Sequence, residues 1–180
     1  MIDTFRRVAG LMAATVLAFL LALHMPAAAQ DASRFDIFEF EIEGNTVLPA
    51  EAIERAVYPF LGEGRNAEDV NSAVAALEKA YQDAGYLTVA VGIPEQAVTT
   101  GVVKLEVTEG KVERLRVTGA EYTLPSRVRE GAPSLAEGGV PHFPEVQEDL
   151  GRLGRNGDLQ VTPLLQPGRV PGSVAVELRL

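Results

Sequence analysis

The chain has 180 residues, of which 47% are hydrophobic and 23% charged, a composition typical of folded globular proteins and not of disordered ones. Its formal net charge of -9 at pH 7 opposes binding to phosphate backbones, and no concentrated basic patch stands out, so we expect no nucleic-acid partner. The chain contains no cysteine, which excludes disulfides, thiolate catalysis and cysteine-ligated metals.

The N-terminal region has the three-part pattern of a secretory signal peptide. Arg6 and Arg7 supply positive charge, residues 8–25 are almost wholly apolar, and small residues follow before Gln30. We therefore predict cleavage between Ala29 and Gln30 and export of the mature chain. The alternative is an uncleaved anchor helix, which N-terminal sequencing would exclude if the mature chain begins at Gln30.

A strand is predicted near the start of the mature chain, over Phe35–Glu43. Apolar and acidic residues alternate there, which is typical of a strand with one buried and one wet face. The buried face is expected to carry Phe38, Phe40 and Ile42. The wet face is expected to carry Glu39, Glu41 and Glu43.

Two helices and two further strands are predicted after this strand. A short helix is predicted with Pro49 in its first turn, and Pro59, Gly62 and Gly64 are expected to end it in a loop. A longer helix begins at Asn66, a good N-cap, and ends before Gly85, which suits the left-handed position after a helix. The period then returns to two, which predicts a hairpin of strands over Leu87–Pro94 and 103–107.

The same order of elements restarts near Lys111, so the chain is predicted to hold two repeats of one small unit. The further elements of the second repeat are expected as helices over Ser126–Glu130 and from Pro144 to Asn156-Gly157, followed by strands over Leu159–Pro167 and 174–180. We therefore predict an α+β fold with a signal peptide at 1–29 and domains at 30–110 and 111–180. Each domain is expected to form a three-stranded mixed sheet with two helices on one face.

The mature chain offers no group of residues arranged for catalysis, so no catalytic residue, cofactor or metal site is predicted. Its one histidine, His142, lies in a loop rich in Gly and Pro and has no partner at a ligand or acid/base spacing. The glutamates of the first strand are spaced for a solvated face, whereas a paired-carboxylate site needs one of them half-buried. An acid/base enzyme is kept only as a third alternative.

An open three-stranded sheet has edge strands whose unpaired N–H and C=O groups can accept a strand from another chain. The best candidate is Leu87–Pro94, where Gly92 permits a bulge or an early end of pairing. A groove between this strand and the longer helix is expected to take an apolar side chain. The predicted polypeptide-binding residues are Leu87, Thr88, Val89, Ala90, Val91 and Ile93 on the strand and Val70, Leu77 and Tyr81 on the helix. The alternative for each of them is a place in the core.

Several short motifs follow one another along both repeats. In the first repeat they lie at Ile42–Pro49, Leu77–Tyr81, Gly85–Thr88, Ile93–Gln96, 101–105 and 107–110. In the second repeat they lie at 117–119, 164–168 and 172–180. In this order and at these spacings, the motifs resemble the POTRA (polypeptide-transport-associated) domains of the hemolysin secretion/activation transporters of two-partner secretion.

The resemblance implies a β-α-α-β-β fold for each repeat, a periplasmic location at the outer membrane, and a role in receiving an extended secreted polypeptide. The implied partners are that polypeptide and an outer-membrane β-barrel, encoded in the same gene or separately. Family members continue into such a barrel, so the chain is expected to be the front end of a transporter, either a fragment or a free-standing reduced protein. The alternative function is a scaffold that docks another envelope protein, a barrel or a divisome-type partner, without binding substrate.

Overall fold

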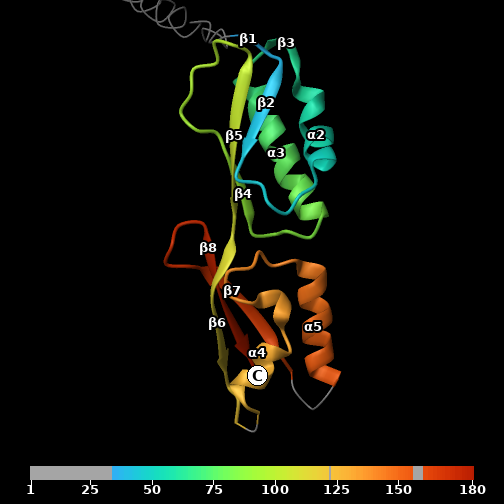
Figure 1. The fold of residues 1–180 in the computed structure, drawn as a ribbon, viewed down its shortest axis with the longest axis vertical. Helices are drawn as coiled ribbons and strands as arrows, with labels where there is room; N and C mark the ends of the chain where they lie inside the picture. Colours follow the sequence, from blue (N-terminus) through green and yellow to red (C-terminus); the bar gives the residue numbers. More distant parts are fainter. Residues whose placement is uncertain (1–33, 122, 156–159) are drawn as a thin grey trace, which may run out of the picture. The chain divides into compact units, whose positions relative to one another are not determined.

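The structure, a computed structural model, describes residues 34–121, 123–155 and 160–180. The predicted signal peptide with its Ala29–Gln30 cleavage site lies outside the described residues, as does the predicted helix end at Asn156-Gly157. Within these ranges the fold is α+β, as predicted, and two repeats of β-α-α-β-β type follow one another along the chain (Figure 1). Across the described ranges, no helix has the length and apolar character that a membrane span requires.

The first repeat contains a three-stranded mixed sheet with the strand order β2-β5-β4. Its strands are β2 (Glu39–Glu43), β4 (Val89–Gly92) and β5 (Val102–Glu109). The central strand β5 runs parallel to β2 and antiparallel to β4. The helices α2 (Ala50–Val57) and α3 (Ala67–Asp83) lie on one face of this sheet, and a 3-10 helix (Tyr58–Phe60) follows α2 (Figure 1). This arrangement confirms the predicted mixed sheet with two helices on one face.

Strict alternation along β5 separates the core from solvent. Val103, Leu105 and Val107 are buried, whereas Lys104 and Glu106 are exposed. The core of the first repeat forms where the buried side chains meet the apolar stripes of α2 and α3. The buried helix residues in this core are Ile53, Val57, Val70, Ala73, Leu77 and Tyr81.

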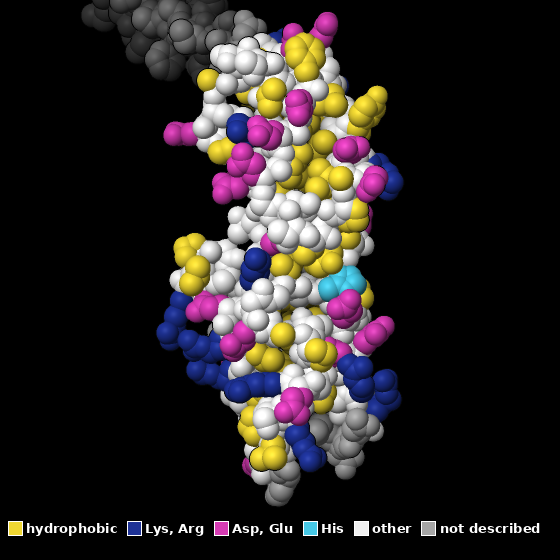
Figure 2. Space-filling model, in the orientation of Figure 1, with side chains coloured by type: hydrophobic (Ala, Val, Ile, Leu, Met, Phe, Trp, Pro, Cys, Tyr) yellow, Lys and Arg dark blue, Asp and Glu magenta, His cyan; other side chains and the backbone are white. Residues whose placement is uncertain are grey.

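The acidic face of β2 is solvated, as the sequence predicts. Glu39, Glu41 and Glu43 are exposed, and Figure 2 shows acidic side chains gathered beside β2 and β5. Lys104 Nζ on the neighbouring strand lies 3.1 Å from Glu41 Oε2 and 3.4 Å from Glu43 Oε1. The hydrogen bond to Glu41 raises the pKa of Lys104, and the charge of this lysine offsets part of the acidic charge of the face.

The predicted strand over Phe35–Glu43 is wrong in one respect, because a break at Phe38 divides it into β1 (Phe35–Ile37) and β2. The amides of Phe38 and Glu39 both donate to Gly101 O, at 2.7 and 3.2 Å, and this shared acceptor interrupts the alternation. Phe38 is consequently 62% exposed, against the prediction that it lies on the buried face.

β1 pairs antiparallel with a strand that is predicted as a loop, β3 (Gly62–Arg65). Glycine is depleted in strands, but Gly62 and Gly64 adopt φ values of +131° and +65° that other residues rarely take. The ladder gains a side-chain contact, because the Asp36 carboxylate accepts a hydrogen bond from Gly64 N at 2.9 Å. A short, irregular two-stranded sheet therefore replaces the predicted loop.

The predicted strand over Leu87–Pro94 is shorter than expected, because β4 covers only its central residues. Leu87 and Thr88 form a turn instead, and Pro94 lacks the N–H that a longer ladder needs. Within its shorter range, β4 pairs with β5 as the predicted hairpin.

The second repeat forms a three-stranded sheet with the strand order β6-β8-β7. As in the first repeat, the central strand has one parallel and one antiparallel neighbour. The elements are β6 (Lys111–Thr118), α4 (Pro125–Glu130), a 3-10 helix (Pro133–Leu135), α5 (Phe143–Arg155), β7 (Thr162–Pro167) and β8 (Ser173–Arg179). A second core joins the sheet to both helices, through Val112, Leu115, Val176 and Leu178 on the strands and Val128 and Val146 on the helices.

A buried carboxylate holds the turn between β2 and α2 against the end of β5. Glu109 is 8% exposed and accepts hydrogen bonds from the amides of Thr46 and Val47 at 2.6 and 3.1 Å, and from the Thr46 hydroxyl. Tyr81 of α3 donates its hydroxyl to Asn45 Oδ1 in the same turn at 2.6 Å. Through these hydrogen bonds, the turn links the central strand β5 to the longer helix α3.

The substitution Tyr81→Phe tests this network through the pH dependence of stability. Burial, with the charge of Glu109, raises the pKa of Tyr81 from 10.0 to about 12. The unfolded chain then loses this proton at a lower pH than the folded chain, so the stability that the protonated hydroxyl contributes is complete below pH 10 and is lost as the pH rises toward 12. In urea unfolding we expect the variant to lose about 1 kcal/mol near neutral pH. We expect the difference from wild type to shrink above pH 10.

The matched control is Tyr58→Phe, because the Tyr58 ring is 74% exposed. A difference in unfolding free energy between Tyr81→Phe and wild type that stays constant across the alkaline range would contradict the network.

Candidate functional site

The edge of the first sheet is formed by β4, whose outer side pairs with no strand among the described residues. Thr88 O accepts a hydrogen bond from Gly110 N at 2.9 Å, and the direction of backbone groups alternates along an antiparallel strand. Ala90 therefore directs its backbone groups to β5, while Val89 and Val91 direct theirs outward. This edge presents backbone groups in the alternating order that an added strand requires.

One outward amide of the edge is occupied by a side chain. Val91 N donates to Glu78 Oε1 of α3 at 3.0 Å. A carboxylate on an edge amide satisfies it and blocks unintended pairing with another strand. An incoming strand must therefore displace Glu78 before it can pair with Val91.

An apolar groove with a volume of about 380 Å³ lies where β4 leaves the sheet. The first turn of α3 borders it on one side, and the segment after β4 borders it on another. Its lining residues are Phe35, Ala67, Val70, Asn71, Ile93, Pro94, Glu95, Gln96, Val98 and Val103. Most of them are apolar, and Ile93 is 43% exposed. An apolar side chain that enters the groove would therefore bury both its own surface and the exposed surface of Ile93.

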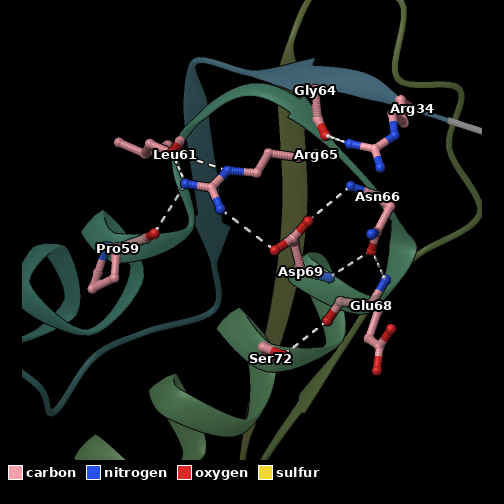
Figure 3. Close-up of polar contacts among 9 residues, drawn as sticks. All are labelled: Arg34, Pro59, Leu61, Gly64, Arg65, Asn66, Glu68, Asp69 and Ser72. Atoms are coloured by element: carbon pink, nitrogen blue, oxygen red, sulfur yellow. Dashed lines mark hydrogen bonds and ion pairs between the residues drawn. The ribbon is translucent and has the colours of Figure 1, made fainter.

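The wall that α3 supplies is held by the cap at its N-terminus, shown in Figure 3. Asn66 Oδ1 accepts hydrogen bonds from the amides of Glu68 and Asp69 at 2.7 and 3.1 Å, and Asp69 accepts one from Asn66 N at 3.0 Å. Arg65 donates to Leu61 O at 3.2 Å and lies 3.4 Å from the Asp69 carboxylate. This reciprocal capping satisfies amides that the helix leaves free and fixes its first turn beside the groove.

The predicted binding residues divide between the groove, the edge and the core. Val70 and Ile93 line the groove, and Val91 supplies an outward amide of the edge. Leu77 and Tyr81 are fully buried, so they belong to the core and do not line the groove. Their helical spacing correctly places them on the inner face of α3, but that face meets the sheet without a gap at their positions.

The other predicted strand residues lie on or beside the edge. Leu87 is 51% exposed in the turn before β4, and the Thr88 hydroxyl donates to Gly110 O at 3.0 Å. Val89 is half-buried, and Ala90 is exposed. Of these four residues, Val89 is the one whose outward backbone groups belong to the free edge.

Three parts of the site escape prediction from the sequence. Glu78 has the pattern of one more solvated acid on a helix, and Phe35 is the first apolar residue of an alternating strand. Val98 lies in a segment without any periodic pattern. Each reaches the site through contacts between segments far apart in the chain, which a local pattern does not report.

His142, which the sequence places in a loop rich in Gly and Pro, is half-buried in the structure. Its Nε2 atom lies 3.1 Å from Ala84 O, and its ring centroid lies 5.1 Å from that of Tyr86. The next amide, Phe143 N, donates to Gly85 O at 2.9 Å. Its Nδ1 atom lies 3.2 Å from Glu145 Oε1, an acidic neighbour that the sequence pattern does not indicate. The contacts with Ala84 and Tyr86 assign His142 a packing role.

The mixed sheet, the two helices on one face and the edge strand beside an apolar groove together define a β-α-α-β-β module of the POTRA class. The family model of the ShlB-type POTRA domain matches residues 35–110. Residues 35–110 are therefore similar to ShlB-type POTRA domains, a family that is not enzymatic.

Known proteins resemble the chain beyond the first repeat. The outer membrane transporter CdiB of Dickeya dadantii is 24% identical over 144 residues, which cover 80% of this chain and 25% of the transporter. The chain thus spans about a quarter of the length of this relative and is homologous to its POTRA region.

Solved structures share the fold across both repeats. CdiB from Escherichia coli superposes with a TM-score of 0.74 at 24% identity, over 86% of this chain and 28% of that protein. POTRA1-3 of the periplasmic domain of Omp85 from Anabaena superpose with a TM-score of 0.67 at 26% identity, over 81% of this chain and 64% of that one. These likenesses confirm the predicted fold of tandem POTRA-like units.

Proposed function

We propose that the two repeats form the periplasmic POTRA region of a two-partner secretion outer-membrane transporter and receive an extended secreted polypeptide. The observation that carries this proposal is the outward backbone edge at Val89 and Val91, which lies beside an apolar groove. An extended chain that adds to this edge gains backbone hydrogen bonds whatever its sequence. Strand addition therefore suits a partner that arrives unfolded.

The groove supplies the selective part of the interaction. Side chains of an added strand alternate between the two faces of the sheet, so some of them turn toward the helices. An apolar side chain that enters beside Val70 and Ile93 contributes on the order of 2 kcal/mol by leaving water. The preferred ligand is thus an extended segment with an apolar residue in register with the groove.

Glu78 lowers the affinity of the proposed binding. Each strand that pairs with Val91 must replace the hydrogen bond from this amide to the Glu78 carboxylate, so part of the gain is lost. Release returns the amide to Glu78 and avoids an unsatisfied donor. A transporter that hands its polypeptide onward needs such a modest affinity.

The domain boundaries and the export route belong to the same proposal. We place the signal peptide at 1–29 and the two domains at 30–110 and 111–180, with the mature chain in the periplasm.

A scaffold would use the same edge for one stable envelope partner. Cross-linking in cells from a photoreactive residue at position 93 separates the two functions, because a scaffold forms one stoichiometric adduct and a receiver captures a polypeptide in transit.

The groove is tested by Ile93→Ser, a change that leaves the core intact because Ile93 is 43% exposed. The probe is a labelled synthetic peptide of alternating valine and threonine residues with lysines at its ends, followed by fluorescence anisotropy. We expect the dissociation constant to rise about fivefold, since apolar burial is lost. Leu124→Ser, at a residue of the second repeat that is 64% exposed, is the matched control. Equal affinity in Ile93→Ser and wild type would overturn the groove as a binding element.

The edge is tested by Glu78→Ala with the same peptide. Removal of the carboxylate frees the Val91 amide for the incoming strand, so we expect binding to tighten about fivefold. Glu54→Ala, an equal loss of one negative charge at an exposed position of α2, is the control for general charge effects. Weaker or unchanged binding in Glu78→Ala would show that the peptide does not pair with this edge.

A further inference from the structure

A second, polar pocket lies in the second repeat, on the face of its sheet that the helices leave open. Its volume is about 210 Å³, and three arginines contribute to its wall: Arg114 and Arg116 of β6, and Arg169 of the loop between β7 and β8. Arg114 and Arg116 flank Leu115, which points to the core, so alternation places both on the opposite face. Figure 2 shows basic side chains gathered beside β6.

The carboxylates in the pocket wall already have partners. Glu113 accepts hydrogen bonds from Val170 N at 3.3 Å, the Ser173 hydroxyl at 3.0 Å and Arg169 N at 2.5 Å, which together lower its pKa. This carboxylate therefore hydrogen-bonds the loop, while the nearby charge of Arg114 lowers its pKa further.

Glu177, the other carboxylate of the wall, pairs with Arg179 Nε at 2.9 Å and accepts from the Thr118 hydroxyl at 2.9 Å. Among the described residues, Arg114, Arg116 and Arg169 form no ion pair within 4.0 Å. Three guanidinium groups consequently remain available to an anion, although the chain as a whole is acidic.

The loop that carries Arg169 also presents an apolar tip. Val170 is 59% exposed, and Pro171 beside it is exposed as well. The loop is held in this conformation by Gly168 N, which donates to Ser173 O at 2.9 Å, and by the Ser173 amide, which donates to Val170 O at 3.0 Å. An apolar tip beside free arginines is typical of proteins that contact a lipid surface, where apolar residues enter the interface and basic residues bind headgroups.

We propose that the arginine pocket binds the phosphate of an anionic phospholipid headgroup, with the Val170 tip in the membrane interface. Guanidinium groups match a phosphate by paired hydrogen bonds, and a pocket of about 210 Å³ has room for a single such group. The site thus attaches the second repeat to an anionic membrane surface and is independent of the β4 edge.

The experiment measures cosedimentation of the full chain with phosphatidylglycerol-containing vesicles and with phosphatidylcholine vesicles. The N-terminal segment, with Arg6, Arg7 and its apolar run, is common to all samples, so the difference between wild type and the pocket variants on anionic vesicles reports the headgroup site. We expect preferential binding to the anionic vesicles that weakens with added salt. The substitutions Arg116→Gln and Arg169→Gln are each expected to weaken it about fivefold.

The matched control is Arg127→Gln, an equal loss of charge on an exposed position of α4, and circular dichroism confirms that each variant is folded. Equal binding to both vesicle types would overturn the proposal, as would pocket variants that behave like Arg127→Gln.

Inorganic phosphate alone and a polyglutamate peptide are titrated in parallel. Tight binding of either without vesicle binding would assign the pocket to a free anion or to an acidic polypeptide instead. None of these outcomes affects peptide binding at the β4 edge, so each of the two proposals can be overturned without the other.

Discussion

The buried charge of Glu109 is the constraint on which the first repeat depends. A carboxylate that is 8% exposed is costly unless it is hydrogen-bonded, and two amides and a hydroxyl of the turn between β2 and α2 satisfy it. The same turn carries Asn45, which accepts the Tyr81 hydroxyl and so holds α3 against the sheet. Because α3 supplies both Glu78 and one wall of the groove, the candidate site depends on a contact that lies outside it.

The edge of β4 could pair with an added strand, yet it is protected against unintended pairing with other chains. Edge strands are commonly shortened, charged or covered to prevent aggregation. Here the strand is short, and its outward amide at Val91 is satisfied by Glu78, a side chain that an incoming strand can displace. In the proposed function, the groove at the end of the strand favours partners with an apolar residue in register. Protection of the edge and the proposed recognition of a partner thus involve the same helix, α3, and the same strand, β4.

Local patterns predict those features that a single segment determines. Strict alternation identifies β5, and the side chain of Asn66 identifies the start of α3, because both depend only on neighbours in the chain. The break at Phe38 could not be predicted, since it depends on the distant carbonyl of Gly101. The sequence indicates a groove between the strand at β4 and the longer helix, but its place beside the first turn of α3 is visible only in three dimensions. The same holds for the contact between Glu78 and the Val91 amide.

Amide hydrogen exchange read by NMR, with and without an extended peptide, tests the central claim most directly. Strand addition at the β4 edge predicts that the outward amides of Val89 and Val91 become slower to exchange when the peptide binds. The amide of Ala90, which already faces β5, should change little. Protection that alternates in this way supports strand addition. Protection confined to another surface, or none along β4 at saturating peptide, would contradict it.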